Sequence, residues 1–171
     1  MLLVFDISDR RAALPLADVE RVVPLALLSR PPGLPSVVEG VLNLGGYAVS
    51  VLRLDRLLGL PIRDPGLYSM VILLKSTALL KGNGGPVAVL VDRVREVLTV
   101  PEAELLPVSP KNSLNGCARA TVSIPDPDTG TVQYIHVLIT GRLLFEKEEQ
   151  ALSEFQQMAQ RRFEHWEVNP E

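Results

Sequence analysis

The stretch from residue 40 to residue 54 constrains the fold of this chain more than any other. It places residues 41–44, a segment apolar enough for a strand, and the β-prone residues 49–52 on either side of the pair Gly45-Gly46. Glycine reaches positive φ without steric cost, so a Gly-Gly pair between two such segments predicts a tight β-hairpin turn. An isolated hairpin is only marginally stable in water, and further strands are therefore expected to cover this one.

The sequence on both sides of the hairpin also favours short strands, because 14 prolines and 12 glycines indicate many turns. Pro15 predicts that its strand is an edge strand or carries a bulge. Residues 81–86 are expected to form a hairpin tip, and Leu79 and Leu80 to extend the strand before it. About ten short strands are typical of barrels or a sandwich, and the pattern leaves two small barrels and one sandwich open. Besides the hairpin, strands are predicted at residues 2–7, 12–16, 68–74, 87–91 continuing through 92–98, 118–124 and 132–139.

Helices are expected at three places. Asp18 precedes the valine-rich segment 19–23, which predicts a short capped helix that Pro24 ends. Residues 55–59 predict one helical turn closed by a glycine. From residue 146 to residue 171 helix-forming residues dominate, with apolar side chains spaced by three and four. This C-terminal amphipathic helix presents Leu152, Phe155, Ala159, Phe163 and Trp166 on one face.

Composition excludes several classes of function. The chain has 171 residues, a net charge of −3 and only dispersed Lys and Arg, so we expect no nucleic-acid partner. A single cysteine, Cys117, excludes an internal disulfide and fits a reducing compartment. No apolar run approaches the ~18 residues of a membrane span, so we expect no membrane insertion and a cytoplasmic protein.

No pattern for catalysis or metal binding is present. His136 and His165 have no second histidine, cysteine or carboxylate at ligand spacing. No nucleophile-elbow motif surrounds a serine, and the glycines at 82–85 precede no lysine followed by Ser or Thr. We therefore expect a non-enzymatic protein with no catalytic residues, no cofactor and no metal.

The hairpin carries a resemblance to a known family. Its order G-x-x-N-L-x-G-x-x-x-x-V-x-x-L resembles the signature of CheW, the bacterial chemotaxis coupling protein, with Asn43 and Leu44 in place. Three positions depart from the usual residues: Gly45 stands for arginine, Ser50 for proline and Arg53 for aspartate.

Three further stretches resemble the same family, so that the resemblance spans residues 1 to about 145. Residues 4–5 with 13–16 resemble its opening strands, and residues 19–23 before a proline-rich loop resemble its first helix and linker. Residues 90–98 resemble its V-D-x-V-x-x-V-L segment.

The resemblance implies a mainly β fold of two intertwined five-stranded SH3-like barrels, with short helices and the C-terminal helix. It implies a CheW-like domain over residues 1–145, divided near residues 64–67, and leaves open whether strands are exchanged between the barrels. Residues 146–171 are then a helix and tail.

The resemblance also implies a function in two-component signal transduction. Such proteins are adaptors that link the cytoplasmic tip of a chemoreceptor (a methyl-accepting chemotaxis protein) to the regulatory domain of a CheA-type histidine kinase. Carried over to this chain, the partner-binding residues in the first barrel are Val19, Val23, Gly40, Asn43, Leu44, Gly45 and Gly46. Those in the second barrel are Val91, Asp92, Arg93 and Val94. A turn or core role is the alternative for each of these residues.

Two other readings stay open. One is a divergent self-assembling scaffold outside standard chemotaxis, forming homo-oligomers through barrel faces or the C-terminal helix; the missing arginine at Gly45 favours it. The other is a small-molecule sensor or enzyme, which the lack of convergent polar residues disfavours.

Overall fold

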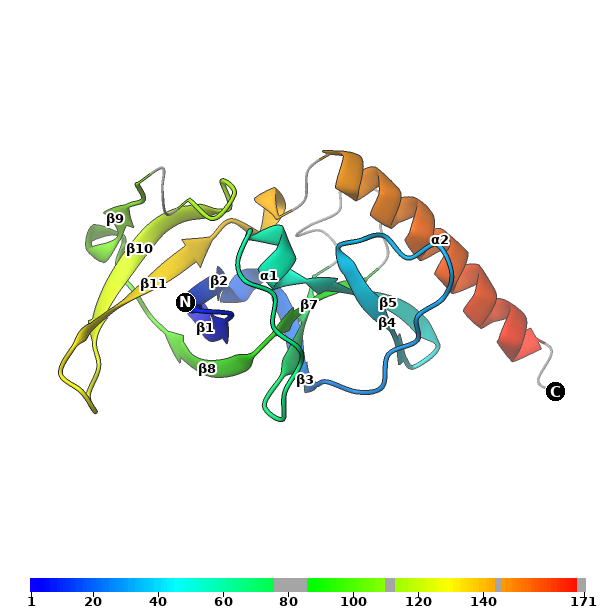
Figure 1. The fold of residues 1–171 in the computed structure, drawn as a ribbon, viewed down its shortest axis with the longest axis horizontal. Helices are drawn as coiled ribbons and strands as arrows, with labels where there is room; N and C mark the ends of the chain where they lie inside the picture. The colour runs from blue at the N-terminus through cyan, green and yellow to red at the C-terminus, as the bar shows by residue number, and fades with distance from the viewer. Residues whose placement is uncertain (76–85, 110–112, 144–145, 169–171) are drawn as a thin grey trace.

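Two β-sheets and one long helix make up most of the protein (Figure 1). The computed structural model of the chain describes residues 1–75, 86–109, 113–143 and 146–168. The six-stranded sheet has the order β8 (Arg93–Leu98), β1 (Leu2–Ile7), β2 (Arg10–Pro15), β11 (Val132–Leu138), β10 (Ala118–Pro125), β9 (Leu106–Pro107). The five-stranded sheet has the order β3 (Val19–Pro24), β6 (Met70–Leu74), β7 (Val87–Val91), β5 (Tyr47–Arg53), β4 (Val38–Leu44).

The six-stranded sheet takes strands from both ends of the chain, and the five-stranded sheet takes consecutive strands from its middle. The six-stranded sheet joins β1 and β2 to β8, β9, β10 and β11, and the five-stranded sheet contains β3 to β7. The chain crosses between the sheets after β2 and again at Asp92, between β7 and β8. The pairs β2–β11 and β5–β7 are parallel, and the other strand pairs are antiparallel. The predicted continuation of residues 87–91 through 92–98 is therefore wrong, because the chain changes sheets between them.

The central hairpin forms as predicted. β4 and β5 are antiparallel, with Leu44 opposite Tyr47 across the two-residue turn. Gly45 and Gly46 have φ angles of 60° and 88°, the left-handed region that a type I′ turn requires at both positions. The predicted single helical turn is present as α1 (Leu54–Leu57).

The predicted helix over residues 19–23 is wrong. This segment is β3, which pairs antiparallel with β6, and the turn before it is a short 3-10 helix, Leu16–Asp18. Five residues are too few for apolar spacing to separate helix from strand. The β-branched valines favour the pleated surface that β6 offers them.

The predicted edge position of Pro15 is also wrong. β2 lies inside its sheet, between β1 and β11. Pro15 is the last residue of β2, and its parallel pairing with β11 covers only Arg11 to Ala13. The missing N–H of Pro15 therefore falls beyond that ladder. The predicted strand extension at Leu79 and Leu80 and the hairpin tip, apart from Pro86, lie outside the described residues.

The C-terminal helix, α2 (Glu146–Val168), packs on the five-stranded sheet. Figure 1 shows it running along the outside of β4 and β5, with its later turns pointing away from the six-stranded sheet. Its predicted apolar face is confirmed for Leu152, Phe155 and Ala159, which are buried, and for Phe163, which packs against them. The side chain of Trp166 lies outside the described part. The same core cluster includes side chains from both sheets, such as Phe5 and Leu52, so one core joins them.

Candidate interaction surfaces

The hairpin turn uses its own polar side chain. The Oδ1 of Asn43 accepts a hydrogen bond from the backbone N–H of Gly46 at 3.0 Å. Gly45 is exposed, and a Cβ there would have no neighbour within 4 Å. Gly40 is different, because a Cβ there would lie 2.7 Å from the Cβ of Leu28 and 2.9 Å from the backbone oxygen of Ser29. Gly40 therefore packs the hairpin onto its loop, while Gly45 faces solvent.

Two glutamines of α2 hold the helix against β5. Gln156, which is buried, accepts a hydrogen bond from the hydroxyl of Ser50 and donates to the carbonyl oxygen of Ala48. One turn later, the Oε1 of Gln160 accepts from the N–H of Ala48 at 2.9 Å, and its Nε2 donates to the oxygen of Gly46 at 3.4 Å. These contacts explain one departure from the family signature, because the proline usual at position 50 has no hydroxyl to donate.

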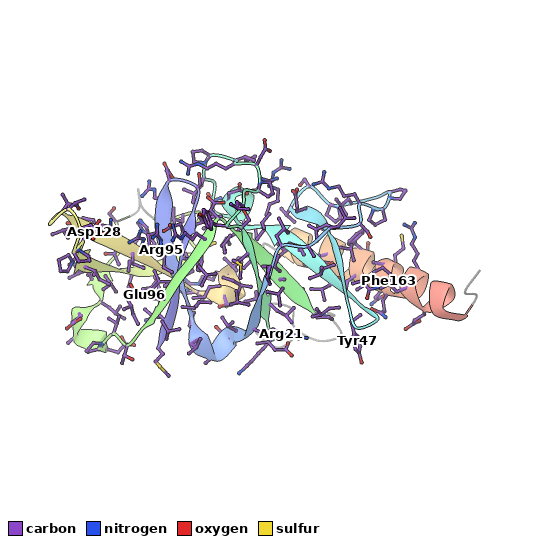
Figure 2. All side chains as sticks on the ribbon, turned by 90° about the horizontal axis from the view of Figure 1, so that it is seen from below. Arg21, Tyr47, Arg95, Glu96, Asp128 and Phe163 are labelled. Atoms are coloured by element: carbon purple, nitrogen blue, oxygen red, sulfur yellow. The ribbon has the colours of Figure 1, made fainter. Side chains whose placement is uncertain are left out.

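A groove of about 480 Å³ lies between the hairpin, the loop before β4 and α2. We call it the hairpin groove; it is lined by Ser29, Pro31, Val41, Asn43, Ala159, Arg162 and Phe163. Figure 2 shows Tyr47 and Phe163 at this end of the molecule. The groove therefore combines an apolar floor with three polar side chains, Ser29, Asn43 and Arg162.

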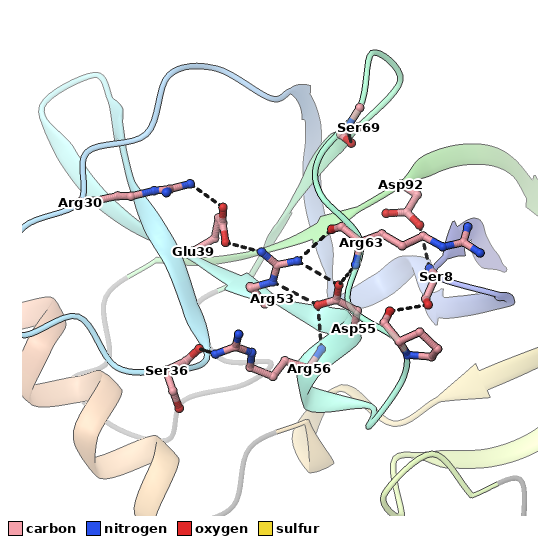
Figure 3. Close-up of polar contacts among 12 residues, drawn as sticks. Ser8, Arg30, Ser36, Glu39, Arg53, Asp55, Arg56, Arg63, Ser69 and Asp92 are labelled. Atoms are coloured by element: carbon pink, nitrogen blue, oxygen red, sulfur yellow. Dashed lines mark hydrogen bonds and ion pairs between the residues drawn. The ribbon is translucent and has the colours of Figure 1, made fainter.

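The second departure, Arg53, belongs to a buried ionic cluster (Figure 3). Its guanidinium lies 2.7 Å from Glu39 and 3.1 Å from Asp55, and the three side chains are only 11%, 10% and 6% exposed. Its Nη2 also donates to the carbonyl oxygen of Arg63 at 2.9 Å. The hydrogen bond to Asp55 is the main cause that raises the pKa of Arg53. This cluster links β4, β5, α1 and the connector that follows α1.

The predicted partner residues of β3 are on a strand that does not pair with the hairpin. β3 and β4 are at opposite edges of the five-stranded sheet. Val19 and Val23 are half-buried and pack against different core clusters. The structure therefore brings Asn43, Leu44, Gly45 and Gly46 together at the hairpin tip. Val23 shares a core cluster with Leu44, and Val19 packs against the larger core cluster.

The predicted segment 91–94 lies where the chain passes between the sheets. Val91 is buried and Val94 half-buried, so both serve mainly the core. Asp92 and Arg93 line a second groove of about 750 Å³. We call it the seam groove; it is lined by Asp6, Ser8, Asp9, Arg10, Arg11, Arg63, Tyr68, Asp92, Arg93, Arg95, Gln133 and Tyr134. Burial is the main cause that raises the pKa of Asp92. The hydrogen bond that Asp92 accepts from the N–H of Ser8 at 2.7 Å acts in the opposite direction and lowers this pKa.

Sequence reasoning missed most of the seam groove and the two glutamines. The groove collects residues from four segments, 6–11, 63–68, 92–95 and 133–134, that only the fold brings together, so no local pattern marked it. The glutamines did leave a signal, since polar residues four apart, at 156 and 160, flank the apolar face of α2.

The described residues form neither a metal site nor a membrane-spanning helix. They contain no group of three or more His, Cys, Asp or Glu side chains that would hold a metal ion. Among the helices in the described part of the chain, none is both long enough and apolar enough to cross a membrane.

Comparison with known proteins agrees with the fold. A family model described as CheW-like domain matches residues 1–136. The chain is 28% identical over 104 residues to "Chemotaxis protein CheW" of Thermotoga maritima, covering 61% of this chain and 64% of that relative, less than two thirds of its length. The structure is similar to that of the scaffolding protein TtCheW from Thermoanaerobacter tengcongensis, with a TM-score of 0.70, 23% identity, and 86% of this chain and 94% of that chain covered.

Proposed function

The chain belongs to the CheW-like domain family, and on that premise we propose that it is a non-enzymatic adaptor of a chemotaxis-type signalling array. The observation that carries the proposal is the family match over residues 1–136. In this proposal the protein is cytoplasmic and joins the tip of a chemoreceptor to the regulatory domain of a CheA-type histidine kinase. Its two sheets are taken to close into two SH3-like barrels within residues 1–145.

The hairpin groove is the proposed contact for a partner helix. Its apolar floor of Val41, Ala159 and Phe163 suits the apolar face of an amphipathic helix. Asn43 keeps the turn in shape, and Leu44 and Gly45 lie next to it at the hairpin tip. The hairpin therefore offers a rigid edge to the groove, with little side-chain entropy to lose on binding.

Arg162 is the proposed substitute for the arginine that is absent at position 45. It lines the hairpin groove together with Asn43, but it comes from α2 rather than from the hairpin. A guanidinium pairs with a carboxylate through its forked donors, which glycine lacks. The arginine that the family signature has at position 45 would then be replaced in function by an arginine of α2.

The test is the affinity of the purified protein for the helical cytoplasmic tip of a chemoreceptor of the host, measured by calorimetry. Arg162→Glu is expected to weaken binding at least tenfold, because it reverses the charge of the only charged side chain among the described residues that line the groove. Arg161→Glu is the matched control, since this neighbour is equally exposed and lines no part of the groove. Loss of affinity in both variants, or in neither, would contradict the assignment of the groove.

A second candidate function is self-assembly, and one observation favours it. Leu27 is 98% exposed on the loop between β3 and β4. Burial of this apolar side chain between two copies of the chain would be favoured by the hydrophobic effect. Sedimentation velocity at rising concentration is expected to show a dimer or ring that Leu27→Ser disrupts. A monomer at all concentrations would remove this candidate.

A further inference from the structure

The seam groove carries an excess of positive charge in a protein that is negative overall. Five arginines and three aspartates line it, which leaves two positive charges, whereas the whole chain carries −3. Asp6 is paired with Arg11 at 3.0 Å and with Arg95 at 2.7 Å, and Arg10 lies 3.6 Å from Asp9. Arg63 and Arg93 take part in none of the ion pairs formed by the described residues. The charge of Arg63 acts on Asp92 only from a longer distance, where it counteracts the rise in the pKa of Asp92.

The groove is held in shape by polar contacts that join three segments. The N–H of Ser8 donates to Asp92 at 2.7 Å and its hydroxyl donates to the oxygen of Pro61 at 2.5 Å. Ser8 itself has a φ of 53°, a conformation that a non-glycine residue adopts only when its surroundings hold it. These bonds join the β1–β2 turn to the β7–β8 junction and to the connector after α1. Figure 3 shows Arg63 of that connector extending towards Ser8 and Asp92.

Two of the paired arginines are also fixed in place. Arg11 donates to Asp6 and to Gln133, and Arg95 donates to the second oxygen of Asp6. Figure 2 shows Arg95 on the six-stranded side of the molecule. A partner that approaches Arg63 and Arg93 would therefore meet a surface whose neighbouring charges are already ordered, which lowers the entropic cost of binding.

Exposed aromatic and apolar side chains accompany the charges. The guanidinium of Arg93 lies 5.1 Å from the ring centre of Tyr68. Tyr68 and Tyr134 are 64% and 58% exposed, and Leu67, next to Tyr68, is 91% exposed. Tyrosine and arginine are the residue types that most often dominate protein–protein binding energy.

From these observations we propose that the seam groove binds an acidic protein segment. Carboxylates of the segment pair with Arg63 and Arg93, and an apolar side chain packs against Tyr68 and Tyr134. A nucleic-acid strand fits less well, because Asp6, Asp9 and Asp92 would face its phosphates. The inference rests on the proposed adaptor function and adds a second contact, with a stated partner chemistry, on another face than the hairpin groove.

The first experiment uses a probe that does not depend on the identity of the kinase. A fluorescent peptide of glutamate and leucine is titrated against the full-length protein by anisotropy. We expect saturable binding that weakens at least tenfold in the double variant Arg63→Glu with Arg93→Glu and weakens with added salt. Arg142→Glu with Arg161→Glu, at two exposed positions outside both grooves, is the charge-matched control and is expected to bind like the wild type. Failure of the wild type to bind, or equal loss in both double variants, would overturn the inference.

Two further measurements separate the alternatives. A single-stranded oligonucleotide of equal charge is expected to compete poorly, and competition as strong as that of the unlabelled peptide would overturn the assignment to a protein segment. The kinase regulatory domain and the receptor tip are then titrated against the same variants. Binding of a partner that ignores the change at Arg63 and Arg93 would reject the seam groove as its contact while leaving the adaptor function intact. Absence of any partner binding beside intact peptide binding would reject the adaptor function instead.

Discussion

The cluster around Arg53 and the seam groove both combine arginine with carboxylates, but they differ in balance and exposure. Arg53 is almost fully buried and pairs with two carboxylates, and Arg30 forms a further ion pair with Glu39. In the seam groove the arginines outnumber the aspartates, and Arg63 and Arg93 are exposed. Charge that is matched inside the fold stabilises it, whereas unmatched charge at the surface is available for binding.

The largest expected effect comes from breaking the matched cluster. Arg53→Met leaves Glu39 and Asp55 buried without their common partner, and loss of one member of a buried pair costs roughly 3–5 kcal/mol. Urea denaturation measures the free energy of unfolding. Arg95→Met is the control in the seam groove, where the partly exposed pair with Asp6 is expected to contribute about 0–1 kcal/mol. Equal losses of unfolding free energy in the two variants would contradict the claim that the Arg53 cluster stabilises the fold more than the seam-groove pair does.

Within the hairpin, a substitution at Gly40 distinguishes a role in packing from a role in partner binding. Gly40→Ala is expected to lower the free energy of unfolding by about 1–3 kcal/mol, because the new Cβ would overlap Leu28 and Ser29. Gly66→Ala is the control, since a Cβ there meets nothing within 4 Å. If Gly40→Ala kept full stability and lost only partner binding, its role would be contact rather than packing.

The buried glutamine of α2 stabilises the fold through uncharged hydrogen bonds rather than ion pairs. Gln156→Ala removes hydrogen bonds to Ala48 and Ser50 inside the core, and the expected loss is about 1–3 kcal/mol. Hydrogen exchange should then show weaker protection in α2. The exposed neighbour Gln157→Ala should change neither quantity by a measurable amount. Intact protection of α2 after loss of Gln156 would mean that the apolar face alone holds the helix.

The smallest effect concerns pH. Burial, with a further contribution from Arg10, lowers the pKa of His136 below its usual 6.5. Below that value the unfolded chain binds a proton that the folded protein does not, so the stability linked to His136 is lost as pH falls. The free energy of unfolding is expected to decrease from about pH 7 to about pH 5, and less steeply in His136→Gln. Identical slopes in the two proteins would contradict this account.

Local patterns predicted the hairpin and α2 correctly because both are decided by short-range chemistry. The turn needs positive φ at Gly45 and Gly46, and the apolar face of α2 repeats over several turns. Residues 19–23 failed the same kind of reasoning, since β6 decides their conformation from a distant part of the chain.

The candidate sites were less predictable for a related reason. The family signature pointed to the hairpin and to Asp92 and Arg93, and the structure places each beside a groove. The opposite walls of those grooves come from α2 and from β1, β2 and β11, which no single motif includes. Charge balance also emerges only in three dimensions: arginines that are dispersed in the sequence gather at the seam.

The most direct test of the account is the affinity of the wild-type protein for a CheA-type regulatory domain from its host, measured by calorimetry with the melting temperature as a check on folding. We expect saturable binding, weakened at least tenfold in Arg63→Glu with Arg93→Glu at an unchanged melting temperature. No binding by a folded wild-type sample to any such domain or receptor tip would contradict the adaptor function.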